Sequence, residues 1–97
     1  MFEVFWTNRA QTDFRHLKSE PSLSKRYKAV KKTIELLASN LRHRRLQTHE
    51  FLSLKSPHGE KIFEAYAEQS TPAACRVFWC YGPSKDRITN IAITKHP

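Results

Sequence analysis

The chain has 97 residues, of which 17 are Lys or Arg and 9 are Asp or Glu, so its formal net charge at pH 7 is +8. This length suffices for one core, and we expect a single domain over residues 1–97. The sequence has no uninterrupted run of the roughly 20 apolar residues that span a bilayer, and its apolar start lacks the basic residues of a signal peptide. These features argue against a membrane protein and predict a cytoplasmic one.

Positive charge is concentrated in the first half of the chain. Residues 1–48 carry 11 Lys or Arg against 4 Asp or Glu, whereas residues 49–97 carry 6 against 5. A one-sided basic surface is typical of proteins that bind nucleic acid or an acidic protein, although it can also serve only solubility. We predict contact with nucleic acid, with an acidic protein as the alternative or a second partner. The predicted binding residues are Lys25, Arg26, Lys28, Lys31, Lys32, Arg42, Arg44 and Arg45.

A short strand and a helix are predicted at the start of the chain. Residues 2–6 are mostly apolar and aromatic, as in a strand. Thr7 can cap a following helix, because its hydroxyl can accept from a free amide of the first turn. The apolar stripe of this helix runs from Ala10 to Leu17. Pro21 ends it, since proline lacks an amide proton.

A second helix gives the clearest periodic signal in the chain. Ser22 can cap it, and its apolar residues recur in a 4-3-4-3-4 rhythm from Leu23 to Leu41. Asn40 is a plausible stop, because asparagine tolerates the left-handed conformation. Residues 42–60 follow as a basic, histidine-rich segment that we interpret as a packed loop.

The second half of the chain predicts strands. Residues 61–69, 74–81 and 88–95 are rich in β-branched and aromatic residues and are separated by turn sequences. The order is therefore strand, helix, helix and a three-strand meander. This order predicts an α+β domain in which two N-terminal helices pack on one face of a small, mainly antiparallel four-stranded sheet.

Arg76 is the single cation within the apolar strand 74–81. Side chains alternate between the two faces of a strand, so Arg76 and Phe78 lie opposite Val77 and Trp79. A lone guanidinium is costly to bury, so we expect it to face solvent or an anionic partner. Alternation in the last strand places His96 on the same face. The pattern indicates a phosphate-binding site.

The same alternation divides the last strand between the two faces of the sheet. Ile91 and Ile93 share one face, which we expect to belong to the core together with Phe63 and Trp79. Asn90 falls on the other face, with the predicted site.

The two cysteines carry no recognisable site. Cys75 and Cys80 stand five residues apart in one predicted strand and on opposite faces, so they cannot form a disulfide with each other. Their spacing does not match a zinc motif. We expect two reduced thiols in the core or sheet.

The order and spacing of these segments resemble the RelE/ParE superfamily of bacterial type II toxins. Residues 2–17 look like the first strand and helix of that family, and residues 59–66 like its second strand. Residues 75–79 resemble its arginine-bearing strand, and residues 88–97 its last strand with a basic terminus. The resemblance covers essentially the whole chain, and it depends on the arrangement because no single motif is specific.

The resemblance implies two different activities. RelE-like members cut messenger RNA in the ribosomal decoding site without a metal ion, whereas ParE-like members inhibit DNA gyrase. We predict the former, a ribosome-dependent mRNA endonuclease with no cofactor, which a cognate acidic or partly disordered antitoxin neutralises. The alternatives are a non-enzymatic gyrase inhibitor and an inactive member that only binds its antitoxin.

The resemblance assigns two catalytic residues by position. Arg76 matches the arginine that stabilises the phosphate in the family, a task that suits a planar guanidinium fork. His96 falls in the terminal region where relatives place a catalytic side chain. Two simpler interpretations stay open: Arg76 forms an ion pair with Glu64 across the sheet, and His96 belongs to a frayed terminus.

The general base is not assigned by the resemblance. RelE itself carries lysines and an arginine on the strand that matches residues 61–69, whereas the outward residues here are Ile62, Glu64, Tyr66 and Glu68. Glu64 can serve as the base. Four further residues can supply positive charge or acid–base chemistry: Lys55, His58, Lys61 and His49.

Overall fold

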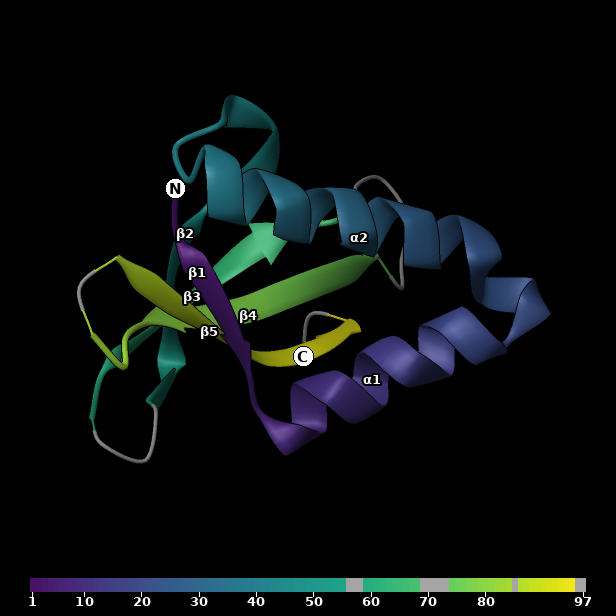
Figure 1. Ribbon diagram of the computed structural model, residues 1–97, viewed down its shortest axis with the longest axis horizontal. Helices are drawn as coiled ribbons and strands as arrows, with labels where there is room; N and C mark the ends of the chain where they lie inside the picture. Colours follow the sequence, from purple (N-terminus) through teal and green to yellow (C-terminus); the bar gives the residue numbers. More distant parts are fainter. Residues whose placement is uncertain (56–58, 69–73, 85, 96–97) are drawn as a thin grey trace.

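The computed structural model describes residues 1–55, 59–68, 74–84 and 86–95, without the side chains of residues 53–55 (Figure 1). Five strands and two long helices form one α+β unit. The elements in chain order are β1 (Glu3–Trp6), α1 (Asn8–Ser19), the 3-10 turn η1 (Pro21–Leu23), α2 (Ser24–Ser39), the 3-10 turn η2 (Arg44–Leu46), β2 (His49–Lys55), β3 (Lys61–Tyr66), β4 (Cys75–Tyr81) and β5 (Arg87–Lys95).

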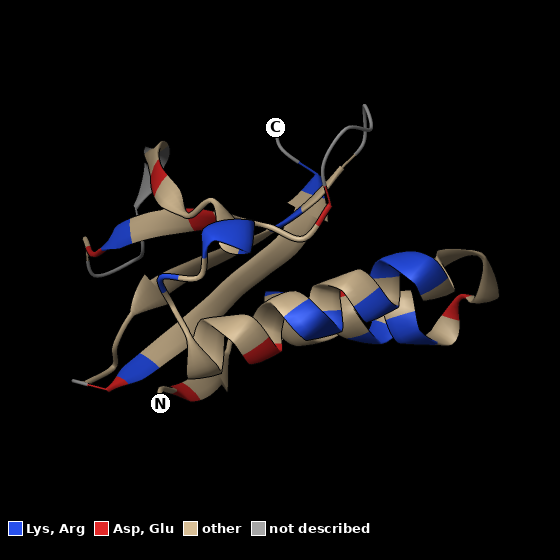
Figure 2. Ribbon diagram, turned by 90° about the horizontal axis from the view of Figure 1, so that it is seen from above, with Lys and Arg blue, Asp and Glu red and all other residues tan. Residues whose placement is uncertain are grey.

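The five strands form one sheet in the order β1-β5-β4-β3-β2. The β1–β5 pair is parallel, and the other three pairs are antiparallel. Helices α1 and α2 lie side by side on the same face of this sheet, as the two views agree (Figures 1 and 2). The predicted fold class is therefore confirmed, with one strand more than expected. No described helix is long and apolar enough to cross a membrane.

The additional strand is β2, which lies within the segment predicted to be a loop. It pairs with β3 at only a few positions, His49 with Glu64 and Glu50 with Phe63, before the register shifts. The register shift interrupts the regular alternation of faces along β2, so its polar and apolar residues give no clear strand period. The loop prediction for residues 42–60 was wrong for this reason.

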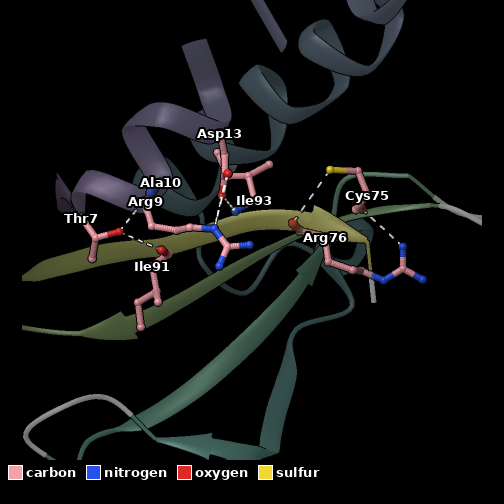
Figure 3. A network of polar contacts seen from close by, with 8 residues as sticks. All are labelled: Thr7, Arg9, Ala10, Asp13, Cys75, Arg76, Ile91 and Ile93. Atoms are coloured by element: carbon pink, nitrogen blue, oxygen red, sulfur yellow. Dashed lines mark hydrogen bonds and ion pairs between the residues drawn. The ribbon is translucent and has the colours of Figure 1, made fainter. Parts of the chain in front are cut away.

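Helix α1 is attached to the sheet at both its cap and its second turn (Figure 3). The Thr7 hydroxyl oxygen accepts from the Ala10 amide at 3.0 Å, which confirms the predicted cap, and donates to the Ile91 carbonyl at 2.7 Å. Asp13 Oδ2 accepts from the Ile93 amide at 2.9 Å. The pairing of β1 with β5 ends before these positions, so α1 satisfies backbone groups that would otherwise lie unpaired at the strand edge.

The predicted boundaries of α2 need two corrections. Ser22 does not cap the helix, because Pro21–Leu23 form a 3-10 turn and the Ser22 hydroxyl donates to Glu20 Oε1 at 3.3 Å. Asn40 does end the helix, and its amide donates to Leu36 O. With φ of −151° it is not left-handed, so it stops the helix without the conformation we expected.

The core lies between the helices and the sheet. An irregularity in β5 decides which side chains of that strand face the core. Trp79 and Ile93 are buried, as predicted. Phe78 pairs with Ala92 but Trp79 pairs with Asn90, so one extra residue of β5 lies between these pairs. Such a bulge reverses the alternation beyond it. Asn90 is therefore buried opposite Trp79 rather than on the predicted site face, and Ile91 is only partly buried.

Candidate active site on the helix-free face

Four side chains gather on the face of the sheet away from the helices: Arg76, Tyr66, Glu64 and His49, which we call the Arg76 cluster. Tyr66 pairs with Arg76 across β3 and β4, so both point to the same side. Glu64 is two residues before Tyr66 and pairs with His49 of β2. Figure 3 shows the Arg76 side chain on the opposite side of the sheet from α1. The face predicted for Arg76 is confirmed.

Arg76 is held by protein groups rather than exposed to solvent. Its side chain is 13% exposed, and its guanidinium carbon lies 3.8 Å from the centroid of the Tyr66 ring. Nη1 donates to the Glu68 carbonyl at 2.6 Å and to its neighbour's carbonyl at 3.3 Å. Nε lies 3.9 Å from Glu64 Oε2, so the ion pair with Glu64 is present, although this distance is too long for a hydrogen bond. Nη2 has no hydrogen bond to the described residues.

Glu64 is the buried acid of the cluster. The residue has no exposed surface, and its Oε1 lies 2.8 Å from His49 Nε2. His49 Nδ1 lies 3.1 Å from the Gln47 carbonyl oxygen. Because a carbonyl oxygen can only accept a hydrogen bond, Nδ1 is the donor of this contact. The two side chains form an ion pair when His49 is protonated, although the geometry at Glu64 Oε1 is not that of a hydrogen bond. A buried carboxylate needs such partners to offset its lost hydration.

Glu68 connects this face to the helices. Its Oε1 accepts from Arg26 Nε of α2 at 2.7 Å and from the Cys75 amide at 3.1 Å, while its carbonyl holds Arg76. The sequence placed Glu68 among outward strand residues, but β3 ends at Tyr66. Nothing in the local pattern marks a carboxylate that reaches a helix far away in the sequence.

The other predicted catalytic residues are not brought into the cluster within the described chain. Lys61 is exposed, and its Nζ lies 3.9 Å from Glu50 Oε1. Lys55 pairs with Lys61 through the backbone of β2 and β3, but its side chain lies outside what the structure describes. His58 and His96 also lie outside the described residues. Their catalytic roles stay predictions.

The predicted basic residues divide into two groups. Arg26 is only partly exposed and belongs to the ion pair with Glu68. The others are exposed, and within the described chain they form no ion pairs. Figure 2 shows Lys and Arg along the helices and near η2. This basic surface consists of Lys25, Lys28, Lys31, Lys32, Arg42, Arg44 and Arg45.

The two cysteines are buried, free thiols. Burial raises the pKa of Cys75 to about 11 and also raises the pKa of Cys80. Because the thiolate is the reactive form of cysteine, both are poor nucleophiles at neutral pH. Among the described residues, no three His, Cys, Asp or Glu side chains are grouped to hold a metal ion.

Solved toxin structures resemble this chain over nearly its whole length. A YoeB/ParE toxin from Agrobacterium tumefaciens superposes with a TM-score of 0.72 at 12% identity, covering 99% of this chain and 100% of the other. A chain from a YoeB-YefM complex of Staphylococcus aureus gives 0.68 at 11% identity, covering 100% and 99%. A chain from an archaeal RelE-RelB complex of Pyrococcus horikoshii gives 0.64 at 12% identity, covering 97% and 93%.

Sequence comparison adds nothing to the structural likeness. No protein-family model and no curated protein matches the chain. At identities near a tenth, the likeness shows the fold alone. The chain therefore folds like these YoeB, ParE and RelE toxin structures.

Proposed function

We propose that the chain is the toxin of a type II toxin–antitoxin system and that it cleaves messenger RNA on the ribosome without a metal ion. The observation that carries the proposal is the Arg76 cluster. It combines a guanidinium whose Nη2 has no hydrogen bond to the described residues with a histidine and a carboxylate 2.8 Å apart. These are the groups that phosphodiester cleavage by a ribose 2′-hydroxyl requires.

Each group has a distinct task in this reaction. Arg76 Nη2 binds a non-bridging oxygen and stabilises the negative charge that develops on phosphorus. His49 in its protonated form is the general acid: Glu64 stabilises the imidazolium, and Nε2 gives its proton to the departing 5′-oxygen once the ring turns from Glu64. The base that takes the 2′-hydroxyl proton is then a separate group. His96 is the candidate, with Lys55, His58 and Lys61 as the remaining predictions.

The partners follow from the fold and the charge. A structure from S. aureus is described as a YoeB-YefM toxin-antitoxin heterotetramer. We propose that an acidic antitoxin also binds this chain, and that the exposed cations of α2 and η2 contact ribosomal RNA when the antitoxin is absent.

Primer extension on an induced message tests the nuclease. Expression should produce new 5′ ends within translated codons. Arg76→Ala should lower the cleavage rate on the order of 10² to 10³-fold, and Arg76→Lys should restore only part, because lysine lacks the fork. Arg9→Ala, on the exposed side of α1, is the matched control and should cleave normally. Full activity of a folded Arg76→Ala variant would exclude the assigned role.

Inhibition of DNA gyrase is the second candidate. It is favoured by the engagement of Arg76 Nη1 with two carbonyls and by the Glu and Tyr side chains on β3 where RelE has cations. Intact transcripts together with relaxed or broken chromosomal DNA would support it over the nuclease. If neither message nor DNA changes while an antitoxin still binds, the chain is an inactive member.

A further inference from the structure

A cavity lies on the helix side of the sheet, near the end of α2. Its volume is about 480 Å³, and its wall comes from the η2 segment, β3 and β4. Phe63 and Trp79, which line it, occupy positions on the two strands that alternate with Glu64 and Phe78. The cavity is therefore separated by the sheet from the Arg76 cluster. We call it the aromatic pocket.

Three aromatic rings form one side of the aromatic pocket. Phe63 and Trp79 stack with centroids 4.9 Å apart and planes inclined by 24°. Tyr81 stands edge-on to both, at 5.6 and 5.0 Å. Tyr81 is 49% exposed although it is large and mostly apolar. An exposed ring beside a stacked pair is a surface on which a flat ligand can stack.

The opposite rim is cationic. Arg42 and Arg44 line the pocket and are exposed, and in the described part of the chain neither has an acidic partner. His43 also lines it, and its Nδ1 accepts from the Arg45 amide at 3.1 Å, so Nε2 carries the ring proton. A guanidinium fork and an imidazole N–H are typical ligands of a phosphate group.

Two lining residues also have unused hydrogen-bonding capacity. Trp79 Nε1 and Thr48 Oγ1 are buried and have no hydrogen-bond partner among residues that the structure describes. Both atoms are buried, so a ligand meets them only after the rim shifts. A nucleobase edge offers the acceptors and donors that these two atoms lack.

We propose that the aromatic pocket binds one nucleotide of RNA, with the base against Tyr81 and the phosphate between Arg42 and Arg44. An apolar ligand would leave the two arginines unused, and an inorganic anion would leave the aromatic rings unused. A nucleotide uses both. This site needs neither the ribosome nor cleavage, so it goes beyond the proposed function and can fail independently of it.

Tryptophan fluorescence can test the site directly, because the chain has only two tryptophans. Trp6 lines a different cavity, and Trp6→Phe leaves Trp79 as the single reporter. Titration of this variant with AMP should give saturable quenching. Adenosine and inorganic phosphate should each bind at least about tenfold more weakly than AMP, since each engages one half of the site.

Paired substitutions on the Trp6→Phe background locate the ligand. Tyr81→Leu should weaken AMP binding on the order of tenfold, whereas Phe5→Leu, a similarly exposed aromatic change on β1, should not. Arg44→Gln should abolish the preference for AMP over adenosine, and Lys31→Gln on α2 should leave it intact. Equal binding of AMP and phosphate, or no saturation at millimolar AMP, would overturn the proposal whether or not the chain cleaves messenger RNA.

Discussion

The buried Asn90 amide should reduce the stability of the fold, and its replacement by leucine tests this. Asn90 has no exposed surface, and its Oδ1 and Nδ2 have no hydrogen-bond partner in the described residues. The extra residue of β5, opposite Phe78 and Trp79, turns this side chain from the open face toward the core. Its backbone carbonyl accepts a hydrogen bond from the Thr7 amide at 3.0 Å. The unpaired groups are therefore those of the side chain.

The magnitude follows from the cost of leaving a polar group buried and unpaired. An unsatisfied donor or acceptor costs about 1–3 kcal/mol. Leucine has nearly the shape of asparagine and no polar atoms, so Asn90→Leu should raise the free energy of unfolding by about 1–3 kcal/mol. Thr33 is the matched control, because it is also buried but its hydroxyl donates to Ala29 O at 2.9 Å. Thr33→Val should therefore not stabilise the chain.

Urea denaturation measures both changes. If only stability changes, the midpoint for Asn90→Leu rises while the slope with denaturant stays as in the parent chain. If Asn90→Leu instead lowers the midpoint, by the amount expected for the loss of a buried hydrogen bond, the amide has partners such as buried water. The argument from unpaired atoms would then be refuted.

Three further predictions follow from named contacts. The unfolded chain releases the Cys75 proton near pH 9 but the folded chain only near pH 11, because burial raises the pKa from 9.0 to about 11. The free energy of unfolding should therefore fall between these values by up to ~3 kcal/mol relative to Cys75→Ala, and parallel pH profiles would contradict this. Ribosome binding should weaken steeply with salt, and Lys31→Gln with Lys32→Gln should flatten that slope; binding that is indifferent to salt would count against an RNA contact. Glu68→Gln should lower the free energy of unfolding by about 1–3 kcal/mol, because charge-assisted hydrogen bonds from α2 and β4 end on its Oε1. Glu50→Gln, which removes an exposed ion pair, should change it by less than about 1 kcal/mol, and equal losses in a urea titration would refute the distinction.

Periodicity predicted the elements whose own residues determine their structure. The apolar rhythm of α2 and the cap at Thr7 depend on neighbours within a few positions, and both were found. Strand β2 depends instead on its pairing with β3. An edge strand with basic and histidine residues has a local pattern close to that of a loop, so only tertiary pairing distinguishes the two.

Alternation along a strand predicted half of the candidate site. It placed Arg76 and Tyr66 on the helix-free face, because β3 and β4 pair without interruption at these positions. It misplaced Asn90, because the inserted residue of β5 reverses the alternation between the residues before it and those after it, and leaves no mark in composition. The burial of Arg76 was also missed. It depends on the carbonyl of Glu68, and a main-chain acceptor has no sequence signature.

One short segment serves both sites of the molecule. Residues 42–48 supply the cationic rim of the aromatic pocket, while the Gln47 carbonyl orients His49 in the Arg76 cluster. Gln47 is left-handed, with φ of 46°, a conformation that costs roughly 1–2 kcal/mol for a residue other than glycine. This conformation ends η2 and directs the chain into β2, so the position of His49 depends on the same turn that places Arg44 at the pocket.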